Sequence, residues 1–189
     1  MKIDAACLGP LGTNAYIVEA AGETILIDPA ENSQALRDFV GSRTLDAVVN
    51  THGHFDHTGG VNAYPEIPLR IHDADLPFLD AFIKERPGGI VKLEDGDTIA
   101  GLRVMSVPGH SPGSVIFIGE DVLIVGDLLF AGSIGRTDLP GGSMGQILES
   151  LDRIIRLPGD YTVFPGHGPK TTLERERETN PFLVGLVKR

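Results

Sequence analysis

Short apolar runs separated by turn residues dominate the first quarter of the chain. The runs Ile3 to Leu8, Tyr16 to Glu19 and Thr24 to Ile27 lie between Gly, Pro and Asn positions, and Asp28-Pro29 ends the third run. Runs of this length bounded by such residues predict β-strands. The pattern changes in Asn32 to Val40, where apolar residues recur at helical spacing and predict a helix.

The rest of the chain alternates the same two patterns. We predict helices near Gly59 to Ala63, over Ala74 to Lys84 and over Gly145 to Arg156. Further strands are predicted at Asp46 to Asn50, Leu69 to His72, Arg103 to Val107, Val115 to Ile118, Asp121 to Val125 and Tyr161 to Phe164. Two similar halves of strands, helix and strands predict a sandwich of two sheets with helices outside, because apolar strands need cover on both faces.

Five of the six histidines follow predicted strand ends. His52, His54 and His57 share the segment His-Gly-His-Phe-Asp-His, His110 lies in a later loop, and His167 lies near the end of the chain. Residues two apart on an extended segment share a face, so His52 and His54 can approach one ion together. Neutral imidazoles with carboxylates and no nearby thiolate are the donors that zinc, iron or manganese binds, so the spacing predicts a metal site.

Asp56 and Asp127 are the carboxylates best placed to join this site. Asp56 lies inside the histidine segment, and Asp127 follows the apolar strand that ends at Gly126. A carboxylate has two oxygens, so Asp127 is able to hold two cations at a fixed separation and to reduce their mutual repulsion. Loops at strand ends let a rigid sheet fix such a constellation.

Length and charge narrow the function classes. A chain of 189 residues with a formal net charge of −10 is long enough for one domain, residues 1–189, and is a poor partner for nucleic acid or an anionic membrane. The N-terminus lacks the pattern of a signal peptide, and no apolar run reaches the length of a membrane span, so we expect a cytoplasmic protein. Cys7, the single cysteine, is expected to be a buried, inert thiol.

Four motifs together resemble the metallo-β-lactamase fold superfamily: Thr51 to Gly60, Pro108 to Gly113, Gly126-Asp127 and Pro165 to Gly168. Within it, the stretch Gly126 to Gly141 is similar to the short glyoxalase II-like bacterial hydrolases. The tail Gly166 to Leu173, with Asn180-Pro181-Phe182, is similar to the same group. The resemblance spans nearly the whole chain.

The resemblance implies an α/β fold, an αββα sandwich of two mixed sheets flanked by helices, with two divalent metal ions, most readily zinc but also iron or manganese. By this analogy His52, His54 and His110 bind the first ion, Asp56, His57 and His167 bind the second, and Asp127 bridges them. It also suggests that Asp28 is a buried carboxylate behind the ligands, where it would accept a hydrogen bond from a ligating imidazole.

The sequence departs from glyoxalase II at Arg136-Thr137-Asp138, where glyoxalase II has a Lys and a Tyr that help to hold glutathione. Arg136 is therefore the candidate to bind a substrate carboxylate, and a solvated loop arginine is the alternative. His72 lies outside the pattern and is expected to be a surface or capping residue. The alternating charges of Glu174 to Glu178 are expected to form a solvated helix face.

These observations favour a metal-dependent hydrolase that cleaves thioesters of a small thiol, S-2-hydroxyacylglutathione or a related acyl thiol, through a metal-bridging hydroxide. A bound cation lowers the pKa of water from far above neutral to about 7, so neither a serine nor a cysteine nucleophile is required. The main alternative is a mononuclear-iron persulfide dioxygenase, which shows a stretch like Gly135 to Asp138. Lactonase and β-lactamase activities use the same metal chemistry and stay open. The expected partner is a small-molecule substrate, and the oligomeric state is not predicted.

Overall fold

The computed structural model describes residues 1–79 and 88–187, and its framework is a pair of six-stranded β-sheets. The first sheet contains β1 (Lys2–Leu8), β2 (Thr13–Ala20), β3 (Glu23–Ile27), β4 (Ala47–Val49), β5 (Leu69–Ile71) and β6 (Ile90–Lys92), in that order. β1, β2 and β3 are antiparallel neighbours, whereas β3 to β6 pair in parallel. The sheet is therefore mixed.

The second sheet is also mixed. Its order is β14 (Thr171–Thr172), β13 (Thr162–Pro165), β10 (Val122–Gly126), β9 (Val115–Ile118), β8 (Leu102–Ser106) and β7 (Thr98–Ile99). β10 and β13 pair in parallel and the other neighbours are antiparallel. A separate hairpin, β11 (Leu129–Phe130) and β12 (Ser133–Ile134), follows β10.

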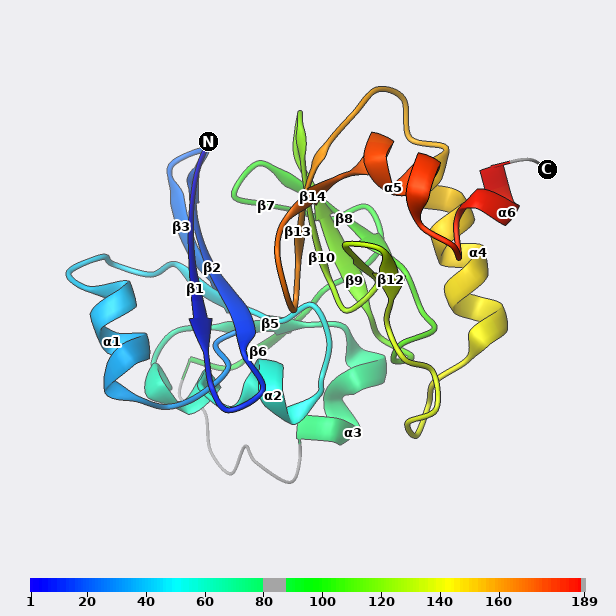
Figure 1. The fold of residues 1–189 in the computed structure, drawn as a ribbon. Helices are drawn as coiled ribbons and strands as arrows, with labels where there is room; N and C mark the ends of the chain where they lie inside the picture. The colour runs from blue at the N-terminus through cyan, green and yellow to red at the C-terminus, as the bar shows by residue number, and fades with distance from the viewer. Residues whose placement is uncertain (80–87, 188–189) are drawn as a thin grey trace.

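Helices cover the outer faces of both sheets, as Figure 1 shows. α1 (Gln34–Val40) lies on the first sheet, and α4 (Met144–Ile155), α5 (Leu173–Thr179) and α6 (Val184–Val187) lie on the second. Shorter helices occupy the connections: α2 (Phe55–Thr58), η1 (Val61–Ala63), η2 (Asp73–Asp75) and α3 (Leu76–Leu79). The predicted αββα arrangement is confirmed.

Alternation along the strands explains the layers. Ile25 and Ile27 of β3 face the second sheet and pack with residues such as Phe117, whereas Leu26 faces outward and packs with Leu36 of α1. Successive side chains of a strand point to opposite faces, so one apolar strand supplies both cores. α4 packs against the second sheet through Ile147, Leu151 and Ile154. Their helical spacing places these three side chains on one face of the helix.

Two helix predictions differ in detail from the structure, and the predicted burial of Cys7 was wrong. The helix expected near Gly59 to Ala63 is two short elements, α2 and η1, with Asp56 and His57 inside the first. The helix expected over Ala74 to Lys84 is η2 followed by α3, and its part beyond Leu79 lies outside the described residues. Cys7 is exposed, because its position on the edge strand β1 faces away from the core.

Glu176 is a further correction to the solvated helix face expected over Glu174 to Glu178. Its carboxylate is fully buried, and it accepts hydrogen bonds from the Thr171 hydroxyl, the Gly132 amide and the Asn180 side chain. A buried carboxylate is tolerated when donors surround it. These bonds tie α5 to the turn of the β11–β12 hairpin.

Parallel direction brings particular strand ends together. β3 and β4 run the same way in the first sheet, and β8, β10 and β13 run the same way in the second. The loops that follow these five strands therefore gather at one edge of the sandwich. Among the described residues, none of the helices has the length and apolar character needed to span a membrane.

Candidate metal centre

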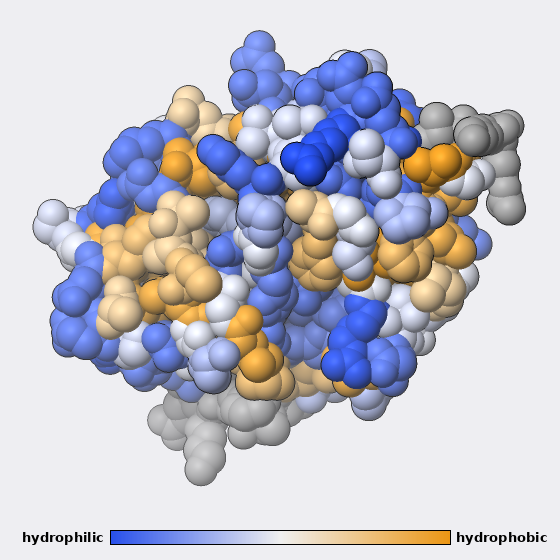
Figure 2. All heavy atoms as spheres, viewed as in Figure 1, coloured by the Kyte–Doolittle hydropathy of each residue, from blue (hydrophilic) through white to orange (hydrophobic). Residues whose placement is uncertain are grey.

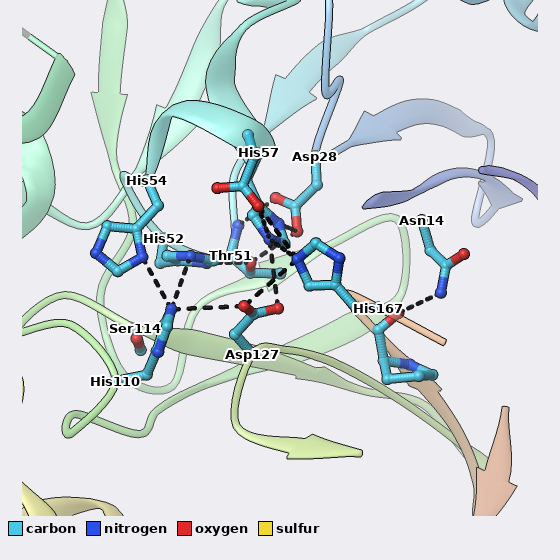
Figure 3. A network of polar contacts seen from close by, with 12 residues as sticks. Asn14, Asp28, Thr51, His52, His54, His57, His110, Ser114, Asp127 and His167 are labelled. Atoms are coloured by element: carbon cyan, nitrogen blue, oxygen red, sulfur yellow. Dashed lines mark hydrogen bonds and ion pairs between the residues drawn. The ribbon is translucent and has the colours of Figure 1, made fainter. Parts of the chain in front are cut away.

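The residues at this edge form one compact cluster of imidazoles and carboxylates (Figure 3). Asp28 follows β3, His52 and His54 follow β4, and Asp56 and His57 belong to α2 directly after them. The second sheet contributes a residue after each of three strands: His110 after β8, Asp127 after β10 and His167 after β13. All seven predicted ligands are thus brought together from both sheets.

The first triad consists of His52, His54 and His110. The Nε2 atom of His110 lies 3.2 Å from Nε2 of His52 and 2.8 Å from Nδ1 of His54. His52 and His110 are buried, and His54 is partly exposed toward a cleft. Three ring nitrogens from two loops therefore point at one place.

The second triad consists of Asp56, His57 and His167. The Nε2 atom of His57 lies 3.3 Å from Nε2 of His167 and 3.8 Å from Oδ2 of Asp56, and Nε2 of His167 lies 3.1 Å from that same oxygen. His57 is fully buried, whereas the side chain of His167 is 27% exposed. This triad is the more open of the two.

Asp127 lies between the two triads. Its Oδ1 atom is 3.3 Å from Nε2 of His57, and its Oδ2 atom is 3.6 Å from Nε2 of both His110 and His167. Within residues 1–79 and 88–187, Oδ1 is one of the few buried polar atoms that has no hydrogen-bond partner. Such an orphaned oxygen is costly unless another group satisfies it.

The donor set suits two metal ions. Ligand atoms about 2.0–2.1 Å from a tetrahedral ion lie roughly 3.3–3.4 Å from one another, close to most of the separations within each triad. Hydrogen bonding alone explains the geometry poorly. A neutral imidazole nitrogen that carries a lone pair accepts a hydrogen bond, so it cannot form one with a nitrogen of a second ring that also presents a lone pair. Cations at the two triads would also satisfy the orphaned oxygen of Asp127.

Burial and neighbouring charges shift the pKa values of the histidines in opposite directions in the two triads. Burial, reinforced by neighbouring histidines, lowers the pKa of His52 and brings that of His54 to about 4, so both rings favour the neutral form that binds metal. Burial also opposes the charged form of His57, but the adjacent carboxylates Asp28 and Asp127 raise its pKa well above the ordinary value. The hydrogen bond to Asp56 raises the pKa of His167.

Hydrogen bonds behind the rings set which nitrogen faces the centre. Nδ1 of His57 donates to Oδ2 of Asp28 at 2.9 Å, and the Thr51 hydroxyl donates to the same oxygen at 2.7 Å. Because that hydroxyl donates to Asp28, it accepts from Nδ1 of His52 at 3.0 Å. Nδ1 of His110 donates to the Arg136 carbonyl at 2.8 Å. Three rings consequently direct Nε2 inward.

Asp28 has a strained backbone for this task, with φ at 50° in the left-handed region. It is buried, and its Oδ1 atom also accepts from the Thr51 amide at 2.8 Å. Strain of this kind persists where surrounding contacts determine the conformation, and it gathers at functional sites. The position fits the expected acceptor behind the ligands.

The loop that presents His167 is held by β2 of the other sheet. The side-chain amide of Asn14 donates to the carbonyls of Pro165 and Gly168, at 3.0 and 2.8 Å, and the Tyr16 hydroxyl donates to Pro165 at 2.6 Å. Figure 3 shows Asn14 beside this loop. The two sheets are thereby joined next to the second triad.

Backbone closes one side of the centre. A Cβ on Gly166 would collide with Oδ1 of Asp127 and lie 2.7 Å from Cε1 of His57. A Cβ on Gly135 would collide with the Asp127 carbonyl. Glycine at these positions therefore lets two loops approach the bridge more closely than any other residue allows.

A cleft of about 460 Å³ opens on the other side. His54, Asp56 and His167 line its base, Arg136 lies at its margin, and apolar walls are contributed by Leu11, Phe55, Phe78, Leu139 and Pro140. Figure 2 shows a hydrophilic recess between the two halves of the molecule, with hydrophobic residues on its border. The cleft has room for a small molecule beside both triads.

Arg136 reaches the cleft, but its guanidinium is already paired. Nε and Nη2 donate to the two carboxylate oxygens of Asp138, both at 2.7 Å, and both side chains are exposed. Arg136 was a predicted site residue, but its pairing with Asp138 was not predicted. His72 is a capping residue as expected, because its Nδ1 accepts from the Ala74 amide at the start of η2.

The centre is also supported by Thr51, Asn14 and Asp75, none of which was predicted from the sequence. Thr51 precedes His52, so its place in the motif was a usable signal. Asn14 and Asp75 lie far from the ligands in sequence and reach them only through the fold. A sequence pattern alone carries no sign of such contacts.

Comparison with known proteins agrees with this geometry. The chain is 33% identical to the probable metallo-hydrolase YqgX of Bacillus subtilis, with 95% of this chain and 96% of that protein covered. It is 31% identical to hydroxyacylglutathione hydrolase GloC of Haemophilus influenzae, over 84% of this chain and 86% of that protein. The structure of TTHA1623 in a di-iron-bound form is similar, with a TM-score of 0.87 and 39% identity over 95% of this chain and 100% of that one.

Residues 8–167 match the family model of the metallo-beta-lactamase superfamily. This range contains all seven residues of the two triads and the bridge. The sandwich fold, the ligand-bearing strand ends and this match agree. The chain belongs to the metallo-beta-lactamase superfamily.

Proposed function

We propose that the protein is a dinuclear metallo-hydrolase that cleaves acyl thioesters of a small thiol, with S-2-hydroxyacylglutathione or a related acyl thiol as substrate. The observation that carries the proposal is the doubled ligand set on either side of Asp127, at the base of a cleft of about 460 Å³. Similarity to the hydroxyacylglutathione hydrolase GloC supports the thioester class.

In this proposal His52, His54 and His110 would hold one ion, Asp56, His57 and His167 would hold the other, and Asp127 would be shared by both. Zinc is the first candidate for both ions, with iron and manganese as alternatives, and the di-iron form of TTHA1623 supports iron. When bound, two divalent cations supply a water-derived nucleophile at neutral pH and polarise a carbonyl oxygen.

The protein's own residues orient the reactants. Asp56 is an ionised acceptor at the base of the cleft: burial opposes the charged form, but in the metal-free protein His167 and His57 lower its pKa to about 2, and a cation at the second triad would favour the charged form in the same direction. A group so weakly basic directs a water proton without keeping it. Asp28 and Thr51 hold His57 and His52 with Nε2 inward. The departing thiolate needs no proton from the protein, because a thiol has an ordinary pKa of about 8.5.

Different residues of the cleft wall are proposed to bind the uncharged and the charged parts of the substrate. Leu11, Phe55, Phe78 and Leu139 form apolar surface for the uncharged portion. Arg136 is the proposed partner of a substrate carboxylate. That carboxylate must compete with Asp138 for the guanidinium of Arg136. Exposed ion pairs contribute little to stability, so a substrate is able to replace Asp138.

The test compares thioester hydrolysis with oxygen consumption. Zinc-loaded and iron-loaded protein is assayed on S-2-hydroxyacylglutathione and on glutathione persulfide, with metal content measured on the same samples. We expect thioester cleavage with either metal and two ions per chain. Oxygen uptake that requires iron, without thioester cleavage, would replace the proposal with the persulfide dioxygenase.

A further inference from the structure

Asp75 is a buried carboxylate that belongs to neither triad but contacts both loops of the first one. It ends η2 and has 0% of its surface exposed. Its Oδ2 atom accepts from the Gly53 amide at 2.7 Å and from the Ser111 hydroxyl at 2.6 Å. Its Oδ1 atom accepts from the Gly113 amide at 2.6 Å. One side chain therefore joins two loops that are distant in sequence.

The donors to Asp75 are neighbours of the first triad. Gly53 lies between His52 and His54, and Ser111 directly follows His110. A single backbone bond, from the Val115 amide to the Thr51 carbonyl at 2.8 Å, also links the two loops. The carboxylate adds three bonds on the side of the ligands, so more hydrogen bonds join the two loops through Asp75 than through this direct backbone bond.

Two glycines make this approach possible. A Cβ on Gly53 would lie 2.7 Å from the Asp75 carbonyl, and a Cβ on Gly113 would lie 2.8 Å from Oδ1 of Asp75. Both positions must lack a side chain for the carboxylate to reach the backbone amides. Charge-assisted bonds of this kind are among the stronger hydrogen bonds in proteins. The packing is therefore organised around Asp75.

We infer that Asp75 is a positioning residue, which holds the loops of residues 51–54 and 110–113 at the separation where His52, His54 and His110 bind one ion. The inference rests on the proposed function, because it takes these three histidines as ligands of the same ion. The structural role is distinct from that of Asp28, which contacts an imidazole directly.

The test replaces Asp75 with Asn in the full chain. Both oxygens of Asp75 accept from backbone amides, so whichever way the new amide is turned, its NH₂ group faces an N–H donor. Asp73→Asn is the matched control: it lies in the same η2 helix, but its exposed carboxylate pairs with exposed Lys92. Zinc affinity of the metal-free proteins is measured by competition with a chelator, in wild type and in a His167→Ala background that retains the first triad.

We expect Asp75→Asn to weaken zinc binding at the first triad roughly 10- to 100-fold, the range for residues that orient metal ligands, and Asp73→Asn to leave it unchanged. Urea unfolding with and without zinc provides the second readout. A purely structural role would lower the stability of the metal-free and zinc-loaded proteins equally, and unchanged zinc affinity would overturn the inference.

Ser111→Ala removes one donor and keeps Asp75, so it carries the test if Asp75→Asn does not fold. We expect a smaller loss of zinc affinity at the first triad, and an unchanged affinity would again overturn the inference. Wild-type protein that binds no zinc, iron or manganese would refute the proposed function together with the inference. Wild-type protein that binds two ions, with Asp75→Asn binding both as tightly, would refute the inference alone.

Discussion

The two triads are built from the same kind of strand-end loop, yet they are supported differently. The first contains only imidazoles and is braced largely through backbone, by the amides that bond to Asp75 and by the Arg136 carbonyl behind His110. The second contains a carboxylate and depends on side-chain pairs, His57 with Asp28 and His167 with Asp56. Its outer ligand, His167, is also partly exposed.

This difference in support indicates that the two triads hold their ions with different affinity. We expect backbone bracing and burial to keep the geometry of the first triad fixed when an ion binds or leaves. The second triad contains two histidines whose pKa values are raised by carboxylates, so an ion must displace protons there. We therefore expect the second position to be the one that loses its ion first.

The largest effect should come from Asp127→Asn, because Asp127 is the residue shared by both triads. The change keeps the shape but removes the charge that lies beside His57, His110 and His167. We expect losses in metal content and turnover that exceed the roughly 10- to 100-fold typical of residues that only orient ligands. Elemental analysis and thioester hydrolysis measure both.

Asp121→Asn is the control for this variant, since Asp121 is exposed beside the opposite end of β10. It should retain wild-type metal content and activity. Two ions at full occupancy in Asp127→Asn would show that Asp127 does not bridge them.

An intermediate effect should separate His110→Ala from His167→Ala. Loss of His167 removes the partly exposed ligand of the second triad, and we expect this variant to keep one ion with an affinity close to that of the wild-type first site. Loss of His110 removes a buried ligand of the first triad, so we expect this variant to lose most of the affinity of the first site and to keep the weaker second site. Zinc titration of the metal-free variants distinguishes the two patterns, and identical losses would contradict the asymmetry.

The smallest effect should lie outside both triads, at the Arg136–Asp138 pair. Asp138→Asn frees the guanidinium, so we expect a severalfold rise in kcat/KM for thioesters that carry a carboxylate and no change for a neutral thioester of similar size. Arg136→Glu should lower activity on the same carboxylate substrates more than on the neutral one. Equal responses of both substrates would remove Arg136 from substrate binding.

Much of the fold could be predicted from local pattern, because strands such as β9 and β10 are short apolar runs between turn residues. The metal ligands were also accessible, since the histidine spacing places them after those strands. The turn geometry of α2 and η1 could not be predicted from the sequence, because a helix of one turn leaves no periodic pattern of apolar residues.

The buried acids show a different limit. Glu176 lies three residues after buried Leu173 and four residues before buried Asn180, so its burial could have been predicted from the helical period rather than from the alternating charges. Asp75 offers no such signal: Asp73, two positions earlier, is exposed, and only the fold distinguishes them.

The glycines that press against Asp127 have an evolutionary consequence. Because backbone closes that side of the centre, any side chain at position 135 or 166 would displace Asp127. The opposite side is bordered by Leu11, Phe55 and Leu139, none of which is in either triad. The residues expected to bind metal therefore differ from the apolar residues expected to select the substrate, so we expect single substitutions at the rim to change substrate preference while the metal ligands stay intact.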